Sequence, residues 1–160
     1  MMAEEIVPSS VWRVRLVRYA PLILWIGVIF FMSSGEASMS ETSRFLRPIL
    51  EFLFPTATES TIQLYHAYIR KFAHFAEYAV LAVLASVAFW NPSGELLRRY
   101  WFAAAVGLVL LVASLDEFNQ SFEPSRTSSV WDVLLDLSGG VTAVAVLYGA
   151  RKFNGKQLSY

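Results

Sequence analysis

The residues best suited to chemistry in this sequence are ionisable side chains that interrupt long apolar stretches. His74 and Glu77 lie near the start of one stretch, Asp116 and Glu117 follow another, and Asp136 lies within the first two turns of a third. Ionisable residues at membrane depth are costly and tend to be functional. Carboxyl and imidazole groups within hydrogen-bond reach of a substrate can act as general acid and base.

Helical spacing places these residues on three faces. Residues three and four positions apart are neighbours on a helix surface. Lipid-facing charge at this depth costs roughly 3 kcal/mol per residue, so we expect the three faces to turn toward one another and form one pocket. The faces consist of Lys71, His74 and Tyr78 with Glu77 beside them, of Asp116 and Gln120, and of Asp132, Asp136 and Gly140.

Two chemical roles follow for such a pocket. In an enzyme, Glu77 or Asp116 would be the general acid or base, with His74 as proton carrier and Glu117 beside them. In a binding site, cations would hold phosphate or carboxylate, while the acids and an amide would bind hydroxyl or amide groups. The candidate ligand-binding residues are Lys71, Tyr78, Gln120, Arg126, Asp132 and Asp136. The residues leave open whether the protein is an enzyme.

Purely structural roles compete with this interpretation. His74 and Glu77 could form an interhelical hydrogen bond that only holds the helices together. Asp116 and Glu117 could end a span in the headgroup region. Asp132 could be a helix N-cap that follows a run of serine and threonine.

Charge and composition exclude several classes of function. The net charge is zero, so nothing indicates nucleic acid as a partner. The absence of cysteine excludes thiol chemistry, and without a two-histidine helical zinc motif no metal site is predicted, while cofactors stay unknown. Acids outnumber fixed cations near the expected pocket, so some carboxyl groups should be protonated unless a metal or cationic ligand joins them.

The apolar stretches predict an all-α membrane protein, a bundle of four transmembrane helices in a single domain over residues 1–160. Hydrophobic residues make up 56% and charged residues 16% of the chain, and the mean hydropathy is +0.47, outside the usual soluble balance. A helix needs about 20 residues to cross a roughly 30 Å hydrocarbon core. The predicted spans are about 18–33, 72–90, 100–117 and 131–150.

Residues 33–70 form the only long connection between spans. Residues 43–54 carry too much apolar surface for a free loop and predict a short helix in the outer membrane interface, ended by Pro55. Residues 58–71 have helical periodicity and should lead directly into the second span. His66 is expected to be an exposed interfacial residue.

The basic residues predict the orientation. An N-terminus inside the cell places eight Lys and Arg residues on the cytoplasmic side and five outside, which favours cytoplasmic termini and a polar cluster at the outer face. An alternative is that the first span is a signal peptide, because Arg13, Arg15 and Arg18 precede its apolar core. Signal cores are usually shorter, so an uncleaved helix is preferred.

Several segments carry polar residues at fixed offsets inside otherwise interchangeable apolar helices. They are Trp25–Ser34, Lys71–Leu81 and Asp116–Gln120, the last followed by Pro124, Arg126 and Asp132–Leu135. On these segments the sequence resembles the VanZ-like family of small bacterial membrane proteins, named for an accessory factor in teicoplanin resistance. The likeness maps the family's polar signature onto Lys71, His74, Glu77, Tyr78, Asp116, Glu117, Gln120, Arg126 and Asp132. Asp136 stands where the family's asparagine is expected.

The resemblance implies a multi-pass protein of the bacterial inner (cytoplasmic) membrane with a role in the cell envelope and a link to glycopeptide-antibiotic resistance. Our leading hypothesis is an outer-face pocket that binds a lipid-linked cell-wall precursor or another glycan component. One alternative is an enzyme that acts on a lipid headgroup or glycan. Another is a proton or ion pathway, although the inner halves of the spans lack ionisable residues. Membrane lipids are expected partners, and a homo-oligomer stays open.

Overall fold

The chain folds into helices only, over the part that the computed structural model describes. That part comprises residues 9–33, 39–90, 94–122 and 129–157, and it contains no strand. The helices are α1 (Ser9–Ser33), α2 (Met39–Leu53), α3 (Glu59–Phe89), α4 (Glu95–Arg99), α5 (Trp101–Gln120) and α6 (Val130–Gln157). The all-α prediction is confirmed.

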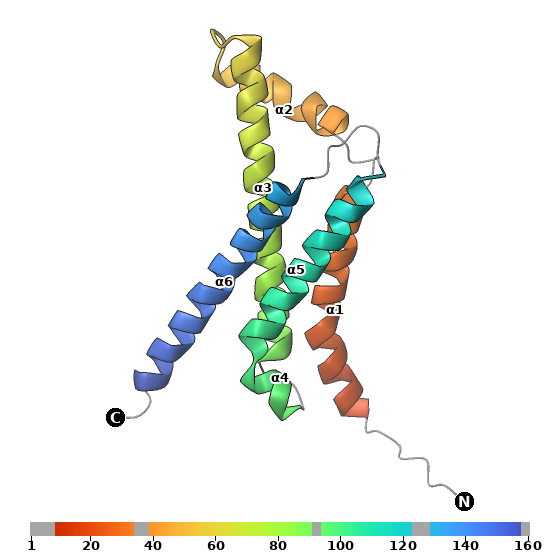
Figure 1. Cartoon of the computed structure of the whole chain (residues 1–160), viewed down its shortest axis with the longest axis vertical. Coiled ribbons are helices and arrows are strands. Elements are labelled where there is room, and N and C mark those ends of the chain that lie inside the picture. The colour runs from red at the N-terminus through yellow and green to blue at the C-terminus, as the bar shows by residue number, and fades with distance from the viewer. Residues whose placement is uncertain (1–8, 34–38, 91–93, 123–128, 158–160) are drawn as a thin grey trace, which may run out of the picture.

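The long helix α3 is the centre of the bundle and packs against α1, α2, α5 and α6 (Figure 1). Its most extensive contact is with α6. The first turns of α1, the short α4 and the last turns of α6 lie at one end of the bundle, whereas α2 and the start of α3 lie at the other (Figure 1). We call the end with α4 the basic end, because it carries Arg13, Arg98, Arg99 and Arg151.

Four helices are long and apolar enough to cross a membrane, as the sequence predicted. They cover Trp12–Ser33, Glu59–Phe89, Trp101–Gln120 and Val130–Phe153. Helices α1 and α3 begin well before the predicted spans and α6 ends well after its span. A charged residue at the end of an apolar run does not interrupt a helix, because the backbone hydrogen bonds of a helix are internal. At 31 residues, α3 is longer than a roughly 30 Å core requires, so it projects beyond that core.

The connection between the first two spans contains the helix expected there. α2 ends at Leu53 shortly before Pro55, and α3 begins after Thr58, whose side-chain oxygen accepts a hydrogen bond from the Thr61 amide at 3.4 Å. Arg47 of α2 forms an ion pair with Glu59 of α3 at 2.6 Å. Residues 59–71 continue without a break into the second span, as predicted. The interfacial position of α2 stays a prediction.

The expectation for His66 is wrong. His66 is only 8% exposed, and Ile62, one turn earlier on α3, is 5% exposed. Both lie on one face of the part of α3 to which α2 is attached, and α2 packs against α3. Whether α2 folds back over this face depends on tertiary packing, which the local sequence does not specify.

The centre of the bundle is packed through small residues. Ala82 and Ala85 of α3 and Ala105 and Ala113 of α5 are fully buried. On α6, a Cβ atom at Gly139 would overlap the backbone oxygen of Phe75 in α3, so glycine permits the closest approach between these helices. Small residues at helix interfaces are typical of membrane bundles, because they let backbones approach closely.

Candidate functional site

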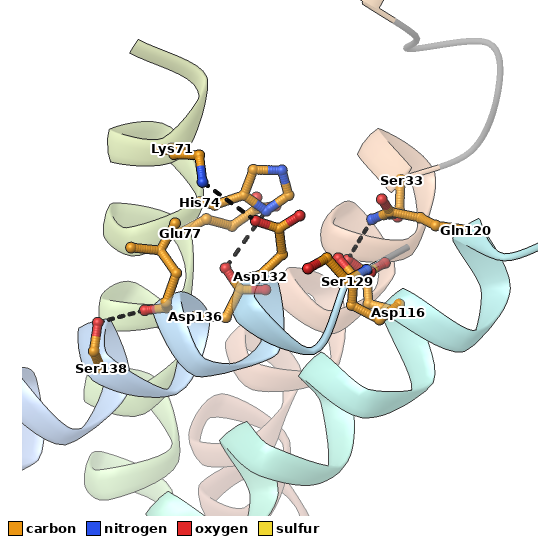
Figure 2. Close-up of polar contacts among 12 residues, drawn as sticks. Ser33, Lys71, His74, Glu77, Asp116, Gln120, Ser129, Asp132, Asp136 and Ser138 are labelled. Atoms are coloured by element: carbon orange, nitrogen blue, oxygen red, sulfur yellow. Dashed lines mark hydrogen bonds and ion pairs between the residues drawn. The ribbon is translucent and has the colours of Figure 1, made fainter. Parts of the chain in front are cut away.

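Polar side chains from α3, α5 and α6 converge where α5 ends and α6 begins (Figure 2). His74 and Glu77 come from α3, Asp116 from α5, and Asp132 and Asp136 from α6. The three helix faces expected from the spacing therefore meet. We call the residues between these three helices the polar cluster: Lys71, His74, Glu77, Tyr78, Asp116, Glu117, Gln120, Asp132 and Asp136.

One close pair in the polar cluster is His74 and Asp136. The Nδ1 atom of His74 lies 3.6 Å from Oδ1 of Asp136, whose side chain is completely buried. This distance exceeds that of an ordinary hydrogen bond. Neither Nδ1 of His74 nor either carboxyl oxygen of Asp136 has a hydrogen-bond partner in the described part of the chain. The pair is an electrostatic contact that a small shift would convert into a hydrogen bond.

A second set of buried groups lies beside this pair. The Tyr78 hydroxyl and Oδ1 of Asp116 are buried, and neither has a hydrogen-bond partner of good geometry among the described residues. The Tyr78 hydroxyl interacts electrostatically with Asp116, Asp136 and Glu77. Because Tyr78 is fully buried and Asp116 is 1% exposed, these groups face each other inside the bundle and do not face lipid.

The polar cluster is joined to α1 through Gln120. The side-chain amide of Gln120 donates hydrogen bonds to Oγ of Ser33 at 2.7 Å and to Oδ2 of Asp116 at 3.0 Å, and all three residues are buried. Deeper in the bundle, the Trp25 indole donates to the backbone oxygen of Glu77 at 3.0 Å. The sequence analysis gave Ser33 and Trp25 no such role, although both lie in the first segment of the family resemblance. α1 packs on α3 and α5, and the uncleaved first helix stays a prediction.

The beginning of α6 is fixed by Glu117 and Ser129. The backbone amide of Ser129 donates to Oε2 of Glu117 at 2.9 Å, and Oγ of Ser129 accepts the Trp131 amide at 3.2 Å. Ser129 therefore caps the helix, and the N-cap interpretation of Asp132 is wrong, since Asp132 already lies inside the first turn. Asp116 and Glu117 do not end the helix, because α5 continues to Gln120, and both acids are buried. Their depth in the membrane stays a prediction.

A pocket of about 150 Å³ is lined in part by residues of the polar cluster. Its lining combines cations with acids: Ala67, Arg70, Lys71, His74, Glu117, Asp132 and Leu135. The Lys71 ammonium lies 3.7 Å from Oδ1 of Asp132, and the two side chains are 58% and 32% exposed. This pair forms the outer rim, whereas His74 belongs to both the pocket and the buried part of the polar cluster.

The predicted site residues thus fall into two groups, one that lines the pocket and one that is buried beside it. Lys71, His74, Glu117 and Asp132 line the pocket, while Tyr78, Asp116, Gln120 and Asp136 lie in the buried layer next to it. Glu77 is half-buried and interacts electrostatically with His74, Asp116 and Asp136. Arg126 lies outside the described residues. Arg70, one of the five basic residues expected at the outer face, also lines the pocket.

Metal binding has no geometric support in the described part of the chain, where no group of three or more His, Asp or Glu side chains could hold a metal ion. The polar cluster brings together one imidazole, several carboxyl groups, one phenol and one amide. Such a set can bind polar groups through hydrogen bonds and can move protons between neighbouring atoms.

Comparison with known proteins gives one match. A protein-family model described as VanZ/LLP1 matches residues 19–151 of the chain. The matched region includes all four long apolar helices in large part and every residue of the polar cluster. No curated protein and no solved structure matches the chain.

Proposed function

Because the chain belongs to the VanZ/LLP1 family and carries four helices able to cross a membrane, we propose that its pocket binds the polar head of a lipid-linked envelope component. The class that we favour is a lipid-linked cell-wall precursor in the bacterial inner membrane, whose phosphate would enter between α3 and α6. In this proposal the N- and C-termini are cytoplasmic and the pocket opens at the outer face.

The observation that carries the proposal is the mixed charge of the pocket lining. Arg70 and Lys71 supply two cations at the rim, and His74 supplies a third donor when protonated. Glu117 of α5 and Asp132 of α6 also line the pocket and can accept hydrogen bonds from hydroxyl or amide groups. Charge-assisted hydrogen bonds to phosphate are roughly twice as strong as neutral ones, so a phosphate flanked by hydroxyl groups matches this lining.

The pocket volume limits what can be held. A cavity of about 150 Å³ in another protein accommodates benzene, which has six heavy atoms. The pocket of this protein has about the same volume, so it fits one phosphate or a single small headgroup. A glycan would extend outside, and a lipid chain would lie along the apolar surfaces of the helices. Leu135 and Ala67 supply apolar lining next to the charged residues.

Native mass spectrometry with a short-chain polyprenyl phosphate and the matching alcohol tests the proposal. We expect the phosphate to bind more tightly than the alcohol. Arg70→Gln and Lys71→Gln should each weaken phosphate binding about tenfold, since a hydrogen bond to a charged group contributes about 1.5 kcal/mol. The matched control is Arg98→Gln, which removes one positive charge at the basic end. Equal affinity for phosphate and alcohol, or equal losses in all three variants, would contradict the proposal.

An enzyme remains a second candidate because of the position of His74. This side chain reaches the pocket and also approaches a buried carboxyl group of Asp136, an arrangement that can orient an imidazole for acid–base catalysis. Glu117 is the carboxyl group that lines the pocket on α5, whereas Asp116 lies in the buried layer. In this candidate His74 and Glu117 would act on the substrate, and Asp136 would position His74.

The enzyme candidate predicts a change in ligand mass. Incubation with envelope lipid extract should give a new product that disappears with His74→Ala, while ligand binding persists. Full product formation by the double variant His74→Ala, Glu117→Gln would exclude this chemistry. A proton pathway has less support, because between the polar cluster and the basic end the described core is apolar apart from Ser86.

A further inference from the structure

A groove of about 500 Å³ lies at the basic end of the bundle, far from the polar cluster along α3. It is formed by the first turns of α1 and the last turn of α3. Its lining consists of Arg13, Val14, Val17, Arg18, Val87 and Trp90. The groove shares no residue with the pocket next to the polar cluster, so its ligand is an independent question.

The two arginines in the groove lie on adjacent rows of α1. Arg13 is one turn before Val17, and Arg18 is one turn after Val14, so both pairs follow the four-residue spacing of neighbours on a helix surface. Neither Arg13 nor Arg18 forms an ion pair or a hydrogen bond through its side chain within the described ranges. Two positive charges therefore face a groove whose other side chains are apolar or aromatic.

Trp90 fixes the depth of this groove relative to the bilayer. Its ring lies edge-on to the Trp101 ring, with centroids 5.8 Å apart, and the Arg151 guanidinium lies over it at 5.2 Å from the centroid. Tyr148 and Phe102 continue the aromatic group at 5.6 Å from each other. Tryptophan and tyrosine concentrate where the hydrocarbon meets the headgroups. The groove therefore spans the boundary between phosphates and acyl chains.

From charge, shape and depth together, we propose that this groove binds an acidic phospholipid of the leaflet at the basic end. The lipid phosphate lies between Arg13 and Arg18, and one acyl chain runs along Val17 and Val87 toward the membrane interior. An anionic headgroup supplies the negative charge that no side chain in the described part of the chain supplies to these arginines. This proposal does not depend on the function proposed for the polar cluster.

The test is competition between phosphatidylglycerol and phosphatidylcholine for the purified full-length protein, measured by native mass spectrometry in mild detergent. Each arginine near an anionic surface contributes about a fivefold preference, so we expect a preference of about 25-fold for phosphatidylglycerol. The double variant Arg13→Gln, Arg18→Gln should bind the two lipids almost equally. The matched control Arg98→Gln, Arg99→Gln removes the same charge from α4 and should keep the preference.

A second variant covers the case in which loss of the arginines disturbs membrane insertion. Val87→Trp fills the groove and keeps both charges, and it should also lower phosphatidylglycerol occupancy. Inorganic phosphate at millimolar concentration should not displace the lipid, because the acyl chain contributes to binding. The proposal is overturned if the wild type shows no preference for phosphatidylglycerol, or if the two double variants lose that preference equally. It is also overturned if Val87→Trp binds phosphatidylglycerol normally, or if inorganic phosphate displaces the lipid.

Discussion

At one end of the bundle Asp116 and Asp136 are almost completely buried between α3, α5 and α6, whereas at the other end Arg13, Arg98 and Arg151 lie exposed around apolar and aromatic side chains. The bundle thus holds acids inside at one end and cations outside at the other. A short carboxyl side chain on an inward face cannot extend past its neighbours to water, but arginine can extend its charged group to the headgroup level.

The two ends of the bundle are therefore stabilised by different interactions. Near the polar cluster, close backbone packing and buried hydrogen bonds hold the helices, and loss of one partner leaves a buried polar group unpaired. At the basic end, aromatic stacking and exposed cations contribute smaller amounts that can be lost singly. The following variants test this contrast in order of expected effect.

The largest loss of stability is expected from Gly139→Ala. The new methyl group overlaps the backbone of α3 at Phe75, so α6 must move away and carry Asp136 from His74. We expect the free energy of unfolding to fall by about 3 kcal/mol, as for a severely overpacked core. The measurement is unfolding in mixed micelles followed by helical circular dichroism. Gly149→Ala on the same helix is the control, because a Cβ there meets nothing within 4 Å, and a similar loss in this variant would contradict the explanation.

A smaller loss is expected from Gln120→Ala. This variant leaves Oδ2 of Asp116 and Oγ of Ser33 without their buried donor and separates α1 from the polar cluster. The expected cost is about 2 kcal/mol, within the range for a buried polar group left unpaired. The exposed neighbour Asn119→Ala should change the free energy of unfolding little. If both variants behave alike, the hydrogen bonds to Ser33 and Asp116 do not hold α1.

At the basic end, Arg151→Gln should reduce stability by less. The guanidinium lies 5.2 Å from the Trp90 ring centroid and 6.0 Å from that of Trp101. An exposed cation–π contact contributes about 0.5 to 1 kcal/mol, so we expect the midpoint of thermal unfolding to fall by roughly 3 °C. Lys152→Gln removes a neighbouring exposed charge and serves as the control. If Arg151→Gln lowers the free energy of unfolding as much as Gln120→Ala does, the two ends of the bundle do not differ in how they are stabilised.

The smallest effect on stability is expected from Lys71→Gln, although it belongs to the polar cluster. Its ion pair with Asp132 spans 3.7 Å and is largely exposed, so it should contribute at most about 0.5 kcal/mol and less at high salt. Thermal unfolding at low and high ionic strength measures this contribution. A salt-independent loss of several degrees would mean that the rim is structural. A normal stability together with weaker phosphate binding would separate the binding role from the structural one.

The local sequence was sufficient to predict the four spans and the helix in the first connection, because apolar length and helical periodicity are properties of consecutive residues. It also predicted that Asp136 and Tyr78 face inward, because the three- and four-residue spacing puts them on faces that carry charged residues, and exposing such a face to lipid is costly. The family membership followed from polar residues at fixed offsets, and the match over residues 19–151 confirms it. The functional roles of these residues and the orientation in the membrane stay predictions.

Only the tertiary structure decided which of these side chains meet. Ser33 contacts Gln120 across 87 positions of sequence, and Glu117 binds the amide of Ser129, while the adjacent Asp116 turns toward Gln120 and Tyr78. The burial of His66 and the separation of the pocket from the buried layer were also beyond the local sequence. These features depend on how each helix is rotated and how closely its backbone approaches the next, which contacts between distant residues such as Gly139 and Phe75 determine.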